Sequence, residues 1–258
     1  MIHKSPVEWL AWVGDLTAFG VRVPPAAVAA VVRPGWWVRP LYGMVVGALP
    51  LAAVTGVALG VVIWLHTRDV LARTGTGAVE LLPTFLAAAV LLELAPVGAG
   101  LILAARTGAS LGAELAAMRV TEQTDALELL GVSARRRLVG PRVLACVLAV
   151  PLLHCLIAAV AMTSGFAAEL VGGQTSYLKY QTAALRELYL IDVVPAGLKT
   201  LAFGLVVGLT GCFIGLTAGG GSEGVGQAAT DSVVMCSLFV LAVDVFLVGL
   251  IKAVQVFL

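Results

Sequence analysis

Charge is scarce in this chain of 258 residues. Asp, Glu, Lys and Arg together make up 12 % of it, whereas apolar residues make up 60 %. Soluble domains carry about 25 % charged residues, so the composition excludes an ordinary soluble protein and indicates a membrane protein. The formal net charge of +1 gives no electrostatic reason to expect a nucleic-acid partner.

Residues that could build a metal, disulfide or nucleotide site are also few. The cysteines form no C-x-x-C pair and lie in apolar stretches, and the histidines are far apart, which excludes the usual metal and disulfide patterns. A Walker A loop needs Gly-Lys followed by Ser or Thr, and none of the lysines follows a glycine. We therefore expect the chain itself to bind no metal or cofactor and to be no enzyme.

Five long stretches carry at most one charged residue each. About 20 apolar residues of helix cross a bilayer, and an open sheet cannot satisfy its backbone polar groups in lipid. The second stretch contains Glu93 and the fifth contains Asp244. The sequence therefore predicts a single-domain, all-α membrane protein with transmembrane helices at residues 40–67, 81–105, 143–168, 200–222 and 232–251.

The distribution of Lys and Arg predicts the orientation. Segments on the N-terminal side of the membrane hold ten of these residues, and segments on the other side hold six, Lys199 included. Cytoplasmic loops are enriched in Lys and Arg, so we expect the N-terminus in the cytoplasm and the C-terminus outside.

The first 39 residues differ from the predicted spans. Apolar side chains recur there at roughly helical spacing among charged residues, which predicts an amphipathic helix in the membrane interface. The alternative is a cleaved signal peptide, but acidic residues interrupt its apolar region. Pro24 and Pro25 should break the helix, and a second short helix is expected on the outer face at residues 172–192. The apolar residues of the first helix are Trp9, Trp12, Leu16 and Phe19, a belt follows at Trp36 and Trp37, and the outer helix carries Tyr177, Tyr180, Arg186 and Tyr189.

Residues 118–137, MRVTEQTDALELLGVSARRR, interrupt the apolar sequence with seven charges. Thr121 can cap a helix that Glu122 opens and Gly131 ends. Two interpretations remain open: a solvated loop whose arginines set the topology, or a docking helix for a cytoplasmic partner, which the ordered pattern favours. Residues three apart share a helix face, so Glu122, Asp125 and Glu128 would form an acidic stripe beside an apolar edge of Leu127 and Leu130.

This segment is part of a longer set of motifs. The runs are ELAPV at 93–97, AELAAM at 113–118, VTEQTDAL at 120–127, GV at 131–132, PRVLA at 141–145 and GGGSEGVGQAAT at 219–230, with Asp244 beyond them. In these motifs the chain closely resembles the MlaE/YrbE permeases of lipid-transporting ABC systems. The resemblance covers about residues 35–257 and agrees with the five spans predicted from charge alone.

The resemblance implies a lipid permease of the bacterial inner membrane that performs no bond chemistry and pairs with a second copy or a paralogue. Lipid would occupy a cavity at the dimer interface. A separate cytoplasmic ABC ATPase would bind ATP and Mg²⁺, and an MCE-domain protein would lie on the outer face. The implied coupling helix spans residues 119–131 and would dock on the ATPase through Arg119, Glu122, Asp125, Leu127, Glu128 and Leu130.

Glu93 lies thirteen residues from both Glu80 and Arg106, so it is near the middle of its span. A carboxylate there is costly and usually marks function or a buried partner. With Pro96, we expect it either at the substrate cavity or its gate, or as a hydrogen-bonded residue that joins helices. Asp244 is expected to be structural. The predicted spans contain no cation that could pair with either carboxylate.

Two short motifs suggest other functions. GASLG at 108–112 satisfies G-x-S-x-G, so Ser110 with His154 as base would make an intramembrane serine hydrolase. Their predicted depths differ too much for a hydrogen bond, and close helix packing explains the small residues better. GGGSEG at 219–224 satisfies G-x-G-x-x-G but lacks the required βαβ unit. We expect a tight cytoplasmic turn there instead, facing the ATPase with Gly220, Glu223, Gly224 and Gly226.

Overall fold

The computed structural model describes residues 6–74, 81–172, 180, 182–184 and 190–257. These residues form helices and turns without a strand, and five helical segments among them are long and apolar enough to cross a membrane. The predicted all-α membrane class is therefore confirmed. The elements are α1 (Pro6–Arg22), α2 (Pro24–Val31), α3 (Pro34–Thr74), α4 (Leu82–Ala88), η2 (Ala89–Leu94), α5 (Ala95–Leu103), η3 (Ala104–Gly108), α6 (Ala109–Val120), α7 (Gln123–Leu129), η4 (Arg135–Val139), α8 (Gly140–Gly172), α10 (Leu190–Leu216) and α11 (Gly221–Phe257).

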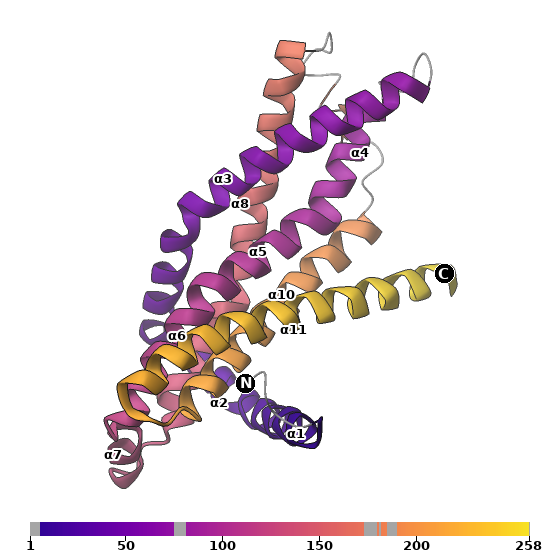
Figure 1. Cartoon of the computed structure of the whole chain (residues 1–258). Helices are drawn as coiled ribbons and strands as arrows, with labels where there is room; N and C mark the ends of the chain where they lie inside the picture. Colours follow the sequence, from indigo (N-terminus) through magenta and orange to yellow (C-terminus); the bar gives the residue numbers. More distant parts are fainter. Residues whose placement is uncertain (1–5, 75–80, 173–179, 181, 185–189, 258) are drawn as a thin grey trace.

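The helices form a bundle with two distinct ends. Figure 1 shows α7 and the turn between α10 and α11 at one end, where α1 and α2 also lie. The C-terminal ends of α3 and α8 are at the other end. We call the first the α7 end. The segment from α4 to α6 runs the length of the bundle as one nearly continuous helix, from Leu82 to Val120.

Glycines allow the helix backbones to approach closely. A Cβ at Gly60 on α3 would overlap the Ala161 carbonyl oxygen of α8, and one at Gly204 on α10 would overlap the Cys146 carbonyl oxygen. Lipid supplies no hydrophobic drive for helix association, so small residues at such contacts allow the van der Waals packing that holds spans together. The packing role predicted for the GASLG motif is confirmed at Gly112, whose Cβ would overlap the Ser232 side chain of α11.

Two π-helical turns, η2 and η3, interrupt the second span. Within η2 the backbone N–H of Ala95 donates to the carbonyl of Val90, five residues earlier. Pro96 follows immediately, and a proline ring inside a helix clashes with the carbonyl four residues before it. The wider turn relieves that clash, and π-turns of this kind are frequent at functional sites.

The fourth and fifth spans differ from the prediction in their bounds. The predicted fourth span, 200–222, is α10 at Leu190–Leu216, and α11 begins at Gly221 rather than at residue 232. The charge-free criterion placed Lys199 outside the membrane, whereas its side chain is buried in the bundle. The first span also begins earlier than predicted, at Pro34, so Trp36 and Trp37 lie in its first turn.

The N-terminal helix packs on the bundle with the face that the sequence predicted to be apolar. The Trp12 ring contacts Phe213 of α10 with centroids 5.5 Å apart and stacks on Phe239 of α11 at 6.1 Å, and Phe19 also contacts Phe213. The predicted break at the two prolines is confirmed, because α1 ends at Arg22 and α2 begins at Pro24. The side chain of Trp9 lies outside the described residues, as do Tyr177, Arg186 and Tyr189 of the predicted outer helix.

Candidate functional site

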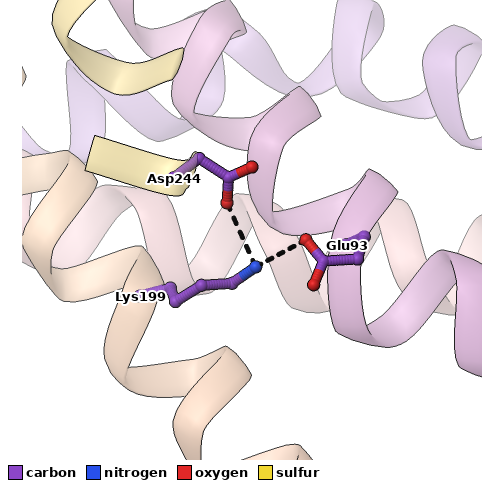
Figure 2. Close-up of polar contacts among 3 residues, drawn as sticks. All are labelled: Glu93, Lys199 and Asp244. Carbon is purple, nitrogen blue, oxygen red and sulfur yellow. Dashed lines mark hydrogen bonds and ion pairs between the residues drawn. The ribbon is translucent and has the colours of Figure 1, made fainter. Parts of the chain in front are cut away.

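Three charged side chains meet inside the bundle. The Lys199 ammonium of α10 donates to Oε2 of Glu93 on η2 at 2.7 Å and to Oδ1 of Asp244 on α11 at 3.1 Å. Figure 2 shows the side chains pointing toward one another from three separate helices. We call these residues the charged triad. It links the second, fourth and fifth candidate spans at one point.

The triad corrects the prediction that neither intramembrane carboxylate has a cationic partner. The charge pattern places Lys199 on the outer side because this residue directly precedes a charge-free run. Two carboxylates in otherwise apolar spans demand a cation, but the sequence does not single out Lys199. The other Lys and Arg residues that directly adjoin a predicted span are Arg39, Arg68, Arg106, Arg142 and Lys252. The pairing itself joins residues 106 and 45 positions apart, which no local pattern reveals.

Burial is uneven across the triad. The side chain of Lys199 is 2 % exposed and that of Asp244 is 16 % exposed, whereas that of Glu93 is 45 % exposed. One ammonium faces two carboxylates, so the fully ionised triad carries a formal charge of −1. An ion pair in low dielectric is stable only when its charges are mutually satisfied. Lys199 keeps Asp244 as a partner if Glu93 moves away. Glu93, the most exposed of the three side chains, is therefore the group best placed to exchange partners.

A small cavity of about 40 Å³ lies beside Glu93 and Lys199. Asp192, Pro195 and Lys252 also line it. That volume suits a few water molecules and is far too small for a lipid. Pro96, predicted with Glu93 at a cavity or gate, is buried and does not line this cavity. Its ring instead shapes the backbone turn that carries Glu93.

A larger apolar cavity of about 530 Å³ lies along α8. His154, Met162 and Phe166 line it on α8, and Leu91 and Tyr180 complete it from other segments. Burial, reinforced by the Glu169 carboxylate, raises the pKa of the Tyr180 hydroxyl to about 12, so this hydroxyl stays protonated well above neutral pH. The volume lies in the range of small-molecule sites, and the lining suits an apolar ligand.

The hydrolase pair is not brought together. Ser110 lines a third cavity, at the α7 end, together with Arg106 and Glu114. His154 lines the apolar cavity along α8, and the two cavities share no lining residue. Nothing in the arrangement supports the serine hydrolase.

The predicted docking helix is present but shorter and capped differently. α7 spans Gln123–Leu129, and Glu122 precedes it in the left-handed region at φ 58°, without a side-chain cap. Thr121 donates its hydroxyl to the Ala117 carbonyl instead of capping α7. Gly131 follows the helix at φ 74°, as expected for a residue that ends one.

The side chains of this segment are largely available. Asp125 forms an ion pair with Arg119, so the acidic stripe is partly neutralised at its centre. Leu130 is 78 % exposed, and Leu129, which the sequence did not single out, is 90 % exposed. Leu127 is half-buried. An ordered helix with exposed leucines and carboxylates at the end of a bundle suits docking, although the predicted contact residues remain predictions.

The glycine-rich segment is a turn only at its beginning. Gly220 and Gly221 have φ of 89° and 69°, which a residue with a side chain rarely adopts. Glu223, Gly224 and Gly226, predicted to lie in the turn, are in the first turns of α11 instead. A Cβ at Gly224 would overlap the Gly219 carbonyl, whereas one at Gly226 would meet nothing within 4 Å. Gly224 is therefore required by the turn, and Gly226 is not.

Comparison with known proteins agrees with this architecture. The chain matches the family described as Permease MlaE over residues 37–250. It is 32 % identical over 244 residues to a probable ABC transporter permease protein of Rickettsia felis, covering 93 % of this chain and 92 % of that protein. It is also 36 % identical over 153 residues to Protein TRIGALACTOSYLDIACYLGLYCEROL 1, chloroplastic, of Arabidopsis thaliana, covering 59 % of this chain and 43 % of that protein. The match includes the second, third and fourth candidate spans, most of the first and fifth, and all three residues of the charged triad. The chain belongs to the MlaE permease family.

Proposed function

We propose that this chain is the membrane subunit of an ABC transporter that moves phospholipid or another hydrophobic lipid between the bacterial inner membrane and an MCE-domain protein. A separate cytoplasmic ATPase supplies the energy. The observation that carries the proposal is the charged triad. It joins the second span, which leads to α7, to the fourth and fifth spans. The second span would have to move against these two spans during transport. Membership of a permease family supports a transporter subunit rather than an enzyme.

The second span connects the triad to the docking helix. Glu93 and Val120 lie in one nearly continuous helical run, and α7 follows after a two-residue turn. The rise of about 1.5 Å per residue puts some 40 Å of helix between Glu93 and α7. Closure of the ATPase would push α7 along this run, and the π-turns η2 and η3 would absorb part of the displacement. Glu93 would then exchange its contact with Lys199, which opens or closes the path beside the triad.

The lipid requires apolar volume that the triad cavity lacks. The cavity along α8 is lined by groups able to solvate an acyl chain. α11 adds an apolar face on the outside of the bundle, where Leu238, Val245 and Phe246 are more than half exposed. A second permease packed on that face would enclose a larger space next to Asp244. The proposed permease is therefore a dimer with its lipid cavity at the interface, and the exposed apolar face of α11 supports this arrangement.

The proposed orientation places the α7 end in the cytoplasm. The segments of this end hold ten Lys and Arg residues. The sequence assigns six to the opposite side, and Lys199 among them is buried in the bundle. This positive-inside bias supports the proposed orientation. The C-terminus would lie on the outer face, where the MCE-domain partner is expected.

Mass spectrometry of what copurifies with the full-length tagged chain in mild detergent tests the proposal. The expected companions are an ATPase, an MCE-domain protein and an enriched lipid. Purification of the chain alone, with covalent labelling of Ser110 by a fluorophosphonate probe, would contradict it. Replacing Ser110 by Ala controls for nonspecific labelling.

A further inference from the structure

The cavity at the α7 end that contains Ser110 has a chemistry unlike that of the other cavities. Its volume is about 440 Å³. Three arginines from three helices line it, Arg39 of α3, Arg106 of η3 and Arg142 of α8, together with one carboxylate, Glu114 of α6. This arginine cavity is distinct from the charged triad, because the thirteen residues from Glu93 to Arg106 correspond to about 20 Å of helix.

The positive charges in the arginine cavity are only partly compensated. Arg142 is 2.5 Å from the Glu114 carboxylate and also donates to the Leu138 carbonyl at 3.0 Å. Among the described residues, Arg39 and Arg106 have no carboxylate within ion-pair distance. With three guanidinium groups and one carboxylate, the lining carries a formal charge of +2. Two guanidinium groups thus lie beside an open volume, and no carboxylate in the described part of the chain pairs with them.

The guanidinium of Arg106 lies close to the backbone of the opposite helix. A Cβ at Gly47 on α3 would lie 2.8 Å from Nη2 of Arg106 and 3.0 Å from its Nε. The guanidinium therefore lies against the bare backbone of Gly47, between the second span and α3. A side chain at position 47 would displace the guanidinium without changing any charge.

The remaining lining indicates what kind of anion would bind. Pro40, Gly43, Met44 and Leu111 add an apolar wall next to the arginines. Guanidinium groups bind phosphate oxygens bidentately and are the preferred partners of phosphate groups in proteins. Arg39 and Arg142 lie near the α7-side ends of their candidate spans, and Arg106 directly follows the apolar run at residues 81–105 that predicts the second span. Such positions suit the depth at which the headgroups of a bilayer are found. A phosphate joined to acyl chains satisfies both parts of the lining.

We propose that the arginine cavity binds the phosphate group of a phospholipid in the leaflet at the α7 end, with Arg39 and Arg106 as its principal ligands. Arg142 contributes less because Glu114 already occupies it. The site does not depend on the transport function: it would hold a lipid whether that lipid is cargo or a permanent component of the protein. Inorganic phosphate offers the same oxygens without the acyl chains.

Native mass spectrometry of the full-length chain in mild detergent tests the site. Phosphatidylglycerol and a diacylglycerol with the same acyl chains are added in equal amounts, with and without 10-fold excess inorganic phosphate. We expect phosphatidylglycerol to be retained at least tenfold more than the diacylglycerol. Equal retention of the two lipids would overturn the proposal, and equal retention combined with bound inorganic phosphate would assign the cavity to a free anion.

Variants locate the binding. The pair Arg39→Gln and Arg106→Gln should reduce retention of phosphatidylglycerol about tenfold. The matched pair Arg135→Gln and Arg136→Gln removes the same charge from exposed positions at the same end and should change it less than twofold. If the first pair fails to fold, Gly47→Ala replaces it, because it displaces Arg106 and should lower retention at unchanged charge. Undiminished retention in the folded arginine pair, or in Gly47→Ala when that variant is needed, would overturn the assignment.

Discussion

Replacing Lys199 by Met removes the one cation of the charged triad and keeps the length of the side chain. It leaves the Glu93 and Asp244 carboxylates, which now contact Lys199 at 2.7 and 3.1 Å, without that partner. Removing one partner of a buried ion pair costs about 3–5 kcal/mol. Because the Glu93 side chain is 45 % exposed, we expect the lower end, about 3 kcal/mol. For a chain of this size, that corresponds to a fall in Tm of about 6–12 °C.

The assay is thermal unfolding of the purified variants in one detergent. Adding Glu93→Gln and Asp244→Asn to Lys199→Met should recover most of the loss, since no unpaired charge then remains. The matched control is Arg73→Met, which breaks a pair at 4.0 Å whose side chains are at least 80 % exposed and should cost less than about 1 kcal/mol. A Lys199→Met variant as stable as the control, or a triple variant that recovers nothing, would refute the reasoning.

Three further changes test other parts of the molecule. Reversing the carboxylates at 122, 125 and 128 to Lys should abolish copurification of the ATPase while the unfolding temperature stays within about 2 °C; an ATPase that still copurifies would contradict the docking role of α7. Gly224→Ala should destabilise the chain by about 2 kcal/mol or more, since its Cβ would overlap the Gly219 carbonyl. Gly226→Ala should be neutral or slightly stabilising. Thermal unfolding compares the two variants, and equal unfolding temperatures would disprove the role of Gly224 in the turn. Trp12→Ala removes a side chain that is 9 % exposed and should weaken the packing of α1 on the bundle by about 3 kcal/mol. The effect would be measured as faster hydrogen exchange in residues 6–22. Unchanged exchange there would show that the aromatic contacts do not hold α1.

The membrane architecture could be predicted from the sequence because it depends on a local property. A span must be apolar over about 20 consecutive residues, and long charge-free runs are visible without any knowledge of packing. The apolar face of α1 and its end before Pro24 were predictable for the same reason, since helical spacing and proline act within a few residues.

The charged triad could not be predicted in this way, and the criterion that found the spans also concealed it. A charge-free rule ends a span at any Lys, yet Lys199 lies inside one because two carboxylates from distant helices compensate it. The cap of α7 was missed for a related reason. The helix of α6 continues to Val120, so Thr121 donates to the carbonyl of Ala117 in that helix and cannot cap the next one.

ATP-driven lipid transfer tests the central claim most directly. The chain is reconstituted with its copurified ATPase and MCE-domain protein in liposomes containing a fluorescent phospholipid, and transfer is followed with and without ATP. The account predicts ATP-dependent transfer in the wild type and at least a tenfold slower rate in Lys199→Met, with the ATPase still bound. Lipid transfer at the same rate with and without ATP, or at the wild-type rate in Lys199→Met, would contradict the account.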